Sequence, residues 1–348
     1  MSTILVTGAS GFIGSFIVSE GLRLGYEVWA GMRGTSSRSY LQDERIRFAE
    51  LDLSNPARLA GQLQGYKSRL GDRGWDYVVH AAGATKCLHP EDFFRTNTDG
   101  TRNLIDGLRQ AGMVPRRFVF LSSLSIFGAV REEPVRKATP DNPWIYSPIL
   151  LTDQPRPNTA YGRSKLEAEQ WLDTVEDLPY VILRPTGVYG PRERDYFMMA
   201  KSIKSHTDFA VGYKQQDITF VYVTDVVQAV FLACEKGVTG RRYFLSDGEV
   251  YQSSTFSNLI RKELGNPWWI RITAPIWVLR VVTFIGEYIG HLTGKVTALN
   301  NDKYNIMRQR NWRCDIKPAR QELGYEPKVK LEEGVRRSIK WYKDNKWL

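Results

Sequence analysis

The chain has 348 residues, 42% of them hydrophobic and 25% charged, which is ordinary composition for one large globular domain or two modest ones. Its formal net charge is +10, yet no nucleic-acid-binding motif accompanies the basic residues, so no nucleic-acid partner is predicted. The three cysteines are scattered, which argues against a disulfide framework, and their spacing predicts no metal site. A predicted strand starts at Thr3 and leaves no room for a secretory signal, so we expect a cytoplasmic protein.

The first predicted strand runs into a glycine-rich turn and then into a helix. Residues 4–6 are apolar, and apolar residues recur at helical spacing over residues 12–24. Glycines in the turn allow the backbone to approach a ligand, and the N–H groups at the start of the helix face an anion. We therefore predict that a dinucleotide pyrophosphate binds here. The residues predicted to hold it are Gly8, Ser10, Gly11, Phe12, Ile13 and Gly14.

The second predicted strand, over residues 27–33, ends where a dinucleotide-binding fold contacts the adenosine ribose. An acidic residue at this point would accept hydrogen bonds from a free 2′-hydroxyl group and would repel a 2′-phosphate. This chain has Gly31 and then Arg33, followed by serines at 36 and 37. Because a guanidinium group suits a phosphate, the pattern favours NADP as the cofactor, with NAD as the alternative.

Strands and helices alternate through residue 187, which is typical of a doubly wound parallel α/β sheet, the Rossmann fold. Asp52 and Leu53 follow the third strand, where a carboxylate can accept a hydrogen bond from the adenine amino group. The small residues Ala81, Ala82 and Gly83 follow the fourth strand and allow the cofactor to lie against the backbone. Further strands are predicted at 118–121 and 180–183, and a helix at 91–111.

The alternation loosens after residue 187. Helices are predicted at 198–205, 225–235 and 254–264, and strands at 219–223 and 242–245. We predict that residues 1–187, with returning segments around 217–250, form an NAD(P)-binding Rossmann domain. Residues 188–216 and 251–348 are expected to form a second, smaller, mostly helical substrate-binding domain.

Tyr161 and Lys165 lie four residues apart on a predicted helix, so the phenol and the ammonium group share one helical face. Interconversion of a ketone and an alcohol needs a hydride transfer and a proton transfer at oxygen. A tyrosine that transfers the proton near neutral pH needs roughly 4 kcal/mol of preferential phenolate stabilisation. A neighbouring lysine and the oxidised nicotinamide can supply it. The alternative is an exposed Tyr-Lys pair without a catalytic role.

These motifs, in this order, resemble those of the extended short-chain dehydrogenase/reductase family, in its NAD(P)-dependent epimerase/dehydratase and 3β-hydroxysteroid dehydrogenase branches. The resemblance implies that Tyr161 exchanges the proton, that Lys165 also holds the nicotinamide ribose, and that Ser123 orients the substrate oxygen. It also adds Asn97, Pro185 and Val188 to the expected cofactor contacts. The motifs that carry it are Gly8/Gly11/Gly14, Asp52-Leu53, Ala81-Ala82-Gly83, Asn97, Ser122-Ser123, Tyr161-xxx-Lys165 and Arg184-Pro185.

Two departures from the family pattern narrow the predicted function. Leu124-Ser125 stands where sugar-nucleotide dehydratases carry an Asp-Glu pair, which argues against water elimination. Ile218 stands where sugar-nucleotide epimerases usually have an arginine for the diphosphate, although Arg192, Arg194 or Lys214 could substitute. We therefore predict an NADP-preferring oxidoreductase for an apolar, steroid-like small molecule. The alternatives are a nucleotide-sugar epimerase that uses the same Tyr-Lys pair and a non-catalytic NADP-binding sensor.

An apolar segment over residues 274–292 has a helical pattern with only a narrow polar stripe. The charges in that stripe argue against a membrane span. Three interpretations remain open: a lid or wall over an apolar substrate, a helix that contacts a membrane surface or a partner, and a plain core helix. A homodimer is also left open by the sequence.

Overall fold

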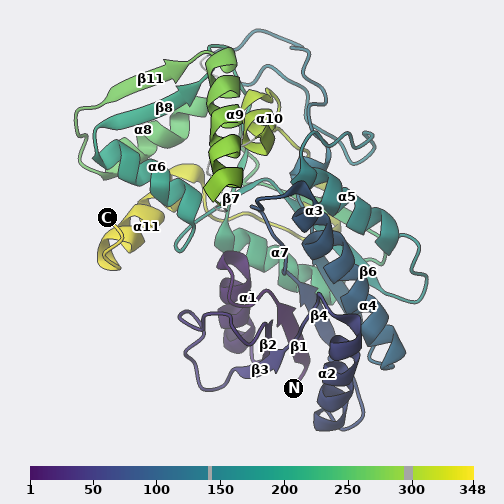
Figure 1. Cartoon of the computed structure of the whole chain (residues 1–348). Helices are drawn as coiled ribbons and strands as arrows, with labels where there is room; N and C mark the ends of the chain where they lie inside the picture. Colours follow the sequence, from purple (N-terminus) through teal and green to yellow (C-terminus); the bar gives the residue numbers. More distant parts are fainter. Residues whose placement is uncertain (140–142, 294–300) are drawn as a thin grey trace.

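A seven-stranded sheet forms the centre of the larger part of the molecule (Figure 1). The computed structural model describes residues 1–139, 143–293 and 301–348, and it describes helix α9 beyond Tyr288 by its backbone alone. Neighbouring strands of the sheet are parallel, in the order β10-β6-β5-β4-β1-β2-β3. They are β1 (Thr3–Thr7), β2 (Glu27–Met32), β3 (Arg47–Glu50), β4 (Tyr77–His80), β5 (Arg117–Leu121), β6 (Tyr180–Pro185) and β10 (Arg242–Leu245).

Helices cover both faces of this sheet, because successive strand residues point to opposite faces and most of them are apolar. In β2, for example, Val28 and Ala30 pack in one apolar core, whereas Trp29 between them packs in the other. The predicted doubly wound parallel α/β fold is therefore confirmed. The first core is covered by α1 (Phe12–Arg23) and α7 (Val223–Lys236), and the second by α2 (Pro56–Arg69), α4 (Gly100–Gln110) and α5 (Ala160–Leu172).

The helix predicted over residues 91–111 is interrupted in the structure. Helix α3 (Pro90–Phe93) leads into a π-helical turn, Phe94–Asp99, which continues as α4. Asn97 lies in this turn, and π-helical turns often occur at functional sites. A single π turn keeps the apolar periodicity nearly unchanged, so the sequence pattern does not separate these segments.

The second part of the molecule contains two small parallel sheets and several helices (Figure 1). A third apolar core lies here, and it includes Tyr189, Phe220, Phe256 and Ile339. The division into two domains at the predicted boundaries stays a prediction. The elements are β7 (Gly187–Tyr189) paired with β9 (Phe220–Tyr222), β8 (Thr207–Val211) paired with β11 (Ile270–Ala274), and α6 (Arg194–Lys204), α8 (Ser253–Glu263), α9 (Ile276–Thr293), α10 (Asn301–Arg308) and α11 (Leu331–Asp344), with a π-helical turn at Ala319–Leu323.

Candidate active site

Gly8 and Gly14 shape the turn that follows β1. Gly8 has a φ of +68°, and a Cβ atom there would lie 2.7 Å from backbone atoms of Ala81 and Ala82. A Cβ atom on Gly14 would lie 2.2 Å from the Gly8 carbonyl oxygen, so α1 approaches the turn this closely only with glycine here. Helix α1 begins after Gly11, and no described side chain caps its first N–H groups. These groups fit an anion such as a dinucleotide pyrophosphate.

A cavity of about 570 Å³ opens beside this turn, at the carboxyl ends of β1 and β4. The strand order reverses between these two strands, and open parallel sheets bind ligands at such a point. Ser54, Arg95 and Thr96 also line the cavity, and no local sequence pattern indicates them. The predicted cofactor contacts that line it are Gly8, Ser10, Gly11, Arg33, Asp52, Leu53, Ala81, Ala82 and Gly83.

One end of this cavity is formed by Gly31, Arg33 and Asp52. A Cβ atom on Gly31 would lie 3.1 Å from Leu5 Cδ1, so a larger residue would crowd the neighbouring strand β1. The Arg33 side chain is exposed and close enough to Asp52 to help lower the pKa of that carboxyl. The larger cause of the lowered pKa is the hydrogen bond that the Ser54 hydroxyl donates to Asp52 Oδ1 at 2.6 Å. This end therefore presents a guanidinium group to a ligand.

The remaining predicted cofactor contacts lie outside the lining of this cavity. The Asn97 side chain accepts a 2.8 Å hydrogen bond from the Ala84 N–H group and donates one of 2.9 Å to the Ser164 hydroxyl. It thereby joins the loop after β4 to helix α5. Phe12, Ile13 and Val188 pack against apolar cores, while Pro185 lines a different pocket, next to Ser123. A direct role of these residues in cofactor binding stays a prediction.

Lys165 is buried on α5, next to the end of β4. A Cβ atom on Gly83, in the cofactor cavity, would lie 3.2 Å from Lys165 Nζ. The ammonium group donates a 2.8 Å hydrogen bond to the Leu121 carbonyl oxygen. Burial lowers the pKa of Lys165 to about 8, an effect that the Glu169 carboxylate one turn further along opposes. The Glu169 carboxylate thus favours the charged form of Lys165.

Tyr161 lies one turn before Lys165 and next to Ser123. Burial raises the pKa of the Tyr161 phenol, and a hydrogen bond with Ser123 acts in the opposite direction. Ser123 Oγ also accepts a 3.1 Å hydrogen bond from the Ser125 N–H group and lines the second pocket. The three predicted catalytic residues thus come together between the two cavities, Lys165 on the cofactor side and Ser123 on the other.

Two carboxylates hold α5 in this position, and neither was indicated by a sequence motif. Asp302, at the start of α10, accepts hydrogen bonds from the N–H groups of Ala160 (2.9 Å) and Tyr161 (3.2 Å). A carboxylate at a helix N-terminus is favourable because the first N–H groups have no partner within the helix. Glu169, further along α5, is buried with Arg184 of β6, whose Nε lies 3.1 Å from Glu169 Oε1.

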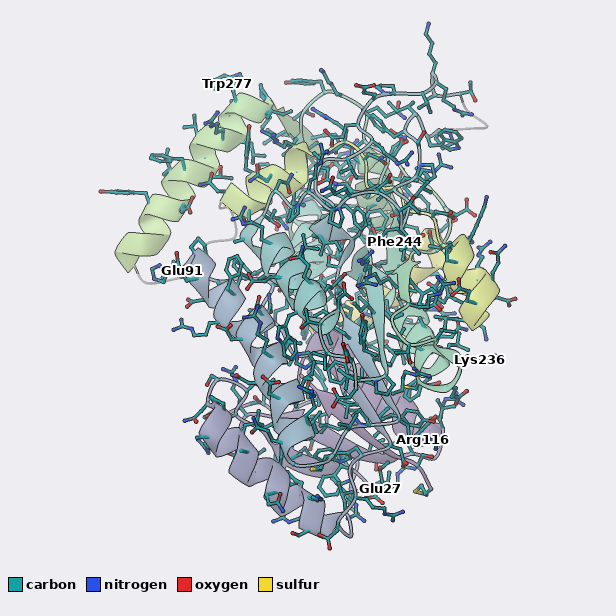
Figure 2. The ribbon with its side chains drawn as sticks, turned by 90° about the vertical axis from the view of Figure 1, so that its right-hand side faces the viewer. Glu27, Glu91, Arg116, Lys236, Phe244 and Trp277 are labelled. Atoms are coloured by element: carbon teal, nitrogen blue, oxygen red, sulfur yellow. The ribbon has the colours of Figure 1, made fainter. Side chains whose placement is uncertain are left out.

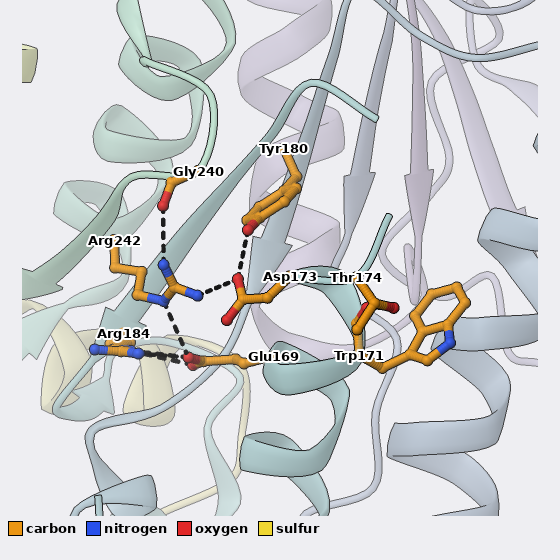
Figure 3. Close-up of polar contacts among 8 residues, drawn as sticks. All are labelled: Glu169, Trp171, Asp173, Thr174, Tyr180, Arg184, Gly240 and Arg242. Atoms are coloured by element: carbon orange, nitrogen blue, oxygen red, sulfur yellow. Dashed lines mark hydrogen bonds and ion pairs between the residues drawn. The ribbon is translucent and has the colours of Figure 1, made fainter. Parts of the chain in front are cut away.

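Figure 3 shows that this buried pair belongs to a larger charged cluster at the edge of the sheet. Arg242 of β10 forms ion pairs with both Glu169 and Asp173, and its Nε lies 3.8 Å from Glu169 Oε2. The Tyr180 hydroxyl donates a hydrogen bond to Asp173. Removing one partner of a buried ion pair leaves an uncompensated charge, which typically costs about 3–5 kcal/mol. The cluster therefore fixes α5 against β6 and β10, and with it the catalytic pair.

A second cavity of about 400 Å³ opens beside Ser123. Residues from β8, α10 and the segments before β7 and β9 form it, including Phe209, Ile218 and Met307. Its charged lining residues are Asp208, Arg271 and Lys303, whereas Arg192, Arg194 and Lys214 lie elsewhere in the described part of the chain. None of the described side chains of α9 contributes to it. The wall expected from residues 274–292 is instead supplied by α10, because α9 packs on the outer side of α10.

The chain matches the model of the NAD dependent epimerase/dehydratase family over residues 4–246, more than half of its length. The chain belongs to the NAD dependent epimerase/dehydratase family. This match confirms the prediction that the chain belongs to the extended short-chain dehydrogenase/reductase class. It also confirms that the chain is an NAD(P)-dependent enzyme.

Among the relatives of this chain are proteins whose names refer to sterols. Sterol-4-alpha-carboxylate 3-dehydrogenase, decarboxylating, of Saccharomyces cerevisiae is 22% identical, and the match covers 98% of each chain. Sterol demethylase protein B of Methylococcus capsulatus is 31% identical over 70% of this chain and 69% of its own. The match to the yeast protein extends beyond the region of the family model.

Solved structures of the epimerase/dehydratase family share the fold. The dTDP-glucose 4,6-dehydratase DesIV of Streptomyces venezuelae, with NAD and TYD bound, superposes with a TM-score of 0.77. It is 21% identical, and the match covers 99% of this chain and 98% of that one. The family model, which describes NAD dependent enzymes, supports a pyridine nucleotide cofactor, while the choice between NAD and NADP is not decided by these comparisons.

Proposed function

We propose that this chain is an NADP-preferring oxidoreductase that interconverts a carbonyl and a secondary alcohol on an apolar, steroid-like substrate. The observation that carries the proposal is the pocket beside Ser123, whose wall includes Phe209, Ile218 and Met307. An apolar ligand gains about 25 cal/mol for each Å² that it buries, so such a wall can supply affinity without ionic contacts. The sterol names of two relatives support the same substrate class.

Tyr161 is the residue that we assign to proton exchange with the substrate oxygen. A bound nicotinamide nucleotide supplies or accepts the hydride at the substrate carbon. Because burial raises the pKa of Tyr161, its phenolate form needs a positive charge nearby, and the Lys165 ammonium lies one helical turn away. The Ser123 hydroxyl, which lies next to Tyr161 and lines the pocket, orients the substrate oxygen.

NADP preference is proposed from the charge at one end of the cofactor cavity. Arg33 and Ser36 line that end, and both can donate hydrogen bonds to a 2′-phosphate. Gly31 offers no carboxylate to the ribose, and its packing against Leu5 disfavours one. These features support NADP over NAD.

A nucleotide-sugar epimerase is the second candidate, because Arg271 and Lys303 bring positive charge into the pocket. Both cations have carboxylate partners: Arg271 Nε lies 2.6 Å from Asp208, and Lys303 Nζ lies 3.6 Å from Asp195. A diphosphate would have to replace these partners, so the pocket favours the apolar substrate. A non-catalytic sensor is disfavoured because the chain keeps both Tyr161 and Lys165.

Thermal unfolding of the NADP complex tests the substrate class. We expect a 3-hydroxysteroid or the matching 3-ketosteroid to raise the Tm by about 3–5 °C at a hundredfold excess over its Kd. UDP- and GDP-sugars should leave the Tm unchanged, because both cations among the described residues that line the pocket already have carboxylate partners. Mass spectrometry of small molecules retained on the purified protein provides an independent comparison. A stabilising nucleotide sugar without a stabilising steroid would contradict the proposal.

A further inference from the structure

The strands β8 and β11 expose large apolar residues, while the one charged residue of β8 is buried. The parallel register sets Arg271 beside Asp208 and, one position on, Ile272 beside Phe209. Asp208 is buried and accepts a hydrogen bond from Arg271, whereas Phe209 is 64% and Ile270 is 60% exposed. Sheets that face water normally show polar residues outward, so the alternation in β8 is inverted.

Helix α9 also exposes large apolar residues. Leu279 and Thr283 face the interior and are 5% and 0% exposed. On the opposite side, apolar residues recur at the helical spacings i, i+4, i+7, i+8 and i+11. Their exposed fractions are 69% for Trp277, 50% for Val281, 67% for Phe284, 50% for Ile285 and 61% for Tyr288.

These elements adjoin one another at the end of the molecule opposite α2 (Figure 1). β11 ends at Ala274 and α9 begins at Ile276, while the Tyr213 hydroxyl after β8 donates a 3.1 Å hydrogen bond to the Thr273 carbonyl. We call the exposed apolar residues of this end the apolar face. It consists of Phe209, Tyr213, Trp268, Ile270, Ile272, Trp277, Val281, Phe284, Ile285 and Tyr288.

Most of the charges around the apolar face are positive. Glu287 of α9 is the exception among the described residues of that helix; it is only partly exposed and accepts a 2.6 Å hydrogen bond from the Asn301 side chain. The sequence contains no aspartate or glutamate from residue 264 to residue 286. Lys204, Lys214 and Arg280 are exposed on the same elements or directly beside them, and the one carboxylate of β8, Asp208, is buried and paired with Arg271. An apolar surface with aromatic side chains and exposed cations is complementary to a lipid bilayer with anionic headgroups.

We propose that the apolar face docks on the surface of such a bilayer. In the described part of the chain no helix is long and apolar enough to cross a membrane. The contact that we propose is with the bilayer surface. Tryptophan and tyrosine, which contribute four residues to the face, favour the boundary between lipid and water. A second copy of this chain fits less well, because a two-fold contact would bring the same cations together.

Docking would place the substrate pocket at the lipid surface. Phe209 belongs to the apolar face and also lines the pocket beside Ser123. A substrate dissolved in the bilayer could then enter without first crossing water. The docking itself does not depend on the proposed catalytic function, since it involves neither the cofactor cavity nor the Tyr-Lys pair.

Vesicle flotation tests the proposal. The unmodified protein should float with phosphatidylcholine vesicles that contain phosphatidylglycerol, and bind pure phosphatidylcholine vesicles more weakly, by about fivefold for each cation engaged. Val281→Glu should weaken binding to the mixed vesicles by at least about tenfold. Phe284→Ser is a second variant without added charge and should weaken binding in the same direction.

Val238→Glu is the matched control, because Val238 is 54% exposed, close to the 50% of Val281. It follows Lys236, which lies on a different side of the molecule from Trp277 (Figure 2). This control should float like the unmodified protein, and all variants should keep their NADPH affinity, which verifies that they are folded. Equal flotation of Val281→Glu and Val238→Glu would overturn the proposal. So would a dimer in solution that binds no vesicles and that Val281→Glu separates into monomers.

Discussion

The cofactor cavity is formed mainly by backbone at the ends of neighbouring strands, whereas the substrate pocket is formed by side chains from distant segments. In the first, Gly8 lies against the backbone of Ala81 and Ala82, and no larger residue fits. In the second, Phe209 of β8 and Met307 of α10 meet Ser123, which follows β5. A site defined by backbone accepts few residue types at its positions and therefore suits one unchanging ligand. A pocket defined by side chains can change its shape by substitution and so can suit different substrates.

The largest expected effect comes from Tyr161, which lies between the two cavities. Tyr161→Phe keeps the shape of both but removes the exchangeable proton, so turnover should fall by about a hundredfold to ten-thousandfold. NADP affinity, measured by fluorescence titration, should stay nearly unchanged. Lys165→Met should lower both turnover and affinity, because Lys165 lies beside the cofactor cavity. Turnover of more than a few per cent in Tyr161→Phe would mean that another acid acts.

Gly8→Ala tests whether backbone defines the cofactor cavity. The added methyl group would meet Ala81 and Ala82 backbone atoms at 2.7 Å, and φ at this position is positive. We expect a loss of more than about 1 kcal/mol in stability and a fall of at least about tenfold in NADPH affinity. Gly65→Ala, in α2 and facing open space, is the matched control and should be neutral or stabilising. Normal NADPH binding by Gly8→Ala would contradict this description of the cavity.

The smallest expected effect is on the preference for NADPH over NADH, to which the Arg33 side chain contributes at a site otherwise formed by backbone. Arg33→Ala should shrink the difference between NADPH and NADH binding free energies by about 1–3 kcal/mol. Arg38→Ala is a suitable control, because Arg38 stacks on the Phe48 ring at 4.0 Å and does not line the cavity. Titrations with both nucleotides measure the difference. Equal affinities for NADPH and NADH in the unmodified protein would refute the proposed preference.

The same contrast explains how much the sequence could predict. Local sequence patterns indicate the strands by apolar periodicity and the turn after β1 by its glycine spacing. They indicate the catalytic helix by the four-residue spacing of Tyr161 and Lys165. Asp302 has none, since it caps α5 from 142 positions away in the sequence. Strands β8 and β11 and helix α10 were also missed, because they are short, with five residues in each strand and eight in the helix.

Residues 274–292 show a second reason why the sequence could not predict the whole structure. Periodicity predicted the α9 helix, but it cannot tell whether an apolar stripe faces a core or the outside. In α11 the apolar residues Val335 and Ile339 are buried, whereas in α9 Trp277 and Phe284 are exposed. Only the packing of α10 beneath α9 distinguishes the two cases.

The most direct test of the proposed function is the net production of reduced nicotinamide. An oxidoreductase leaves the hydride on the cofactor, whereas an epimerase returns it to the sugar. With NADP⁺ and a 3-hydroxysteroid, we predict stoichiometric formation of NADPH and the corresponding ketone, measured by absorbance and mass spectrometry. With UDP-glucose we predict neither NADPH nor UDP-galactose. Exchange of configuration at carbon 4 of the sugar, without net NADPH from any apolar alcohol, would contradict the account.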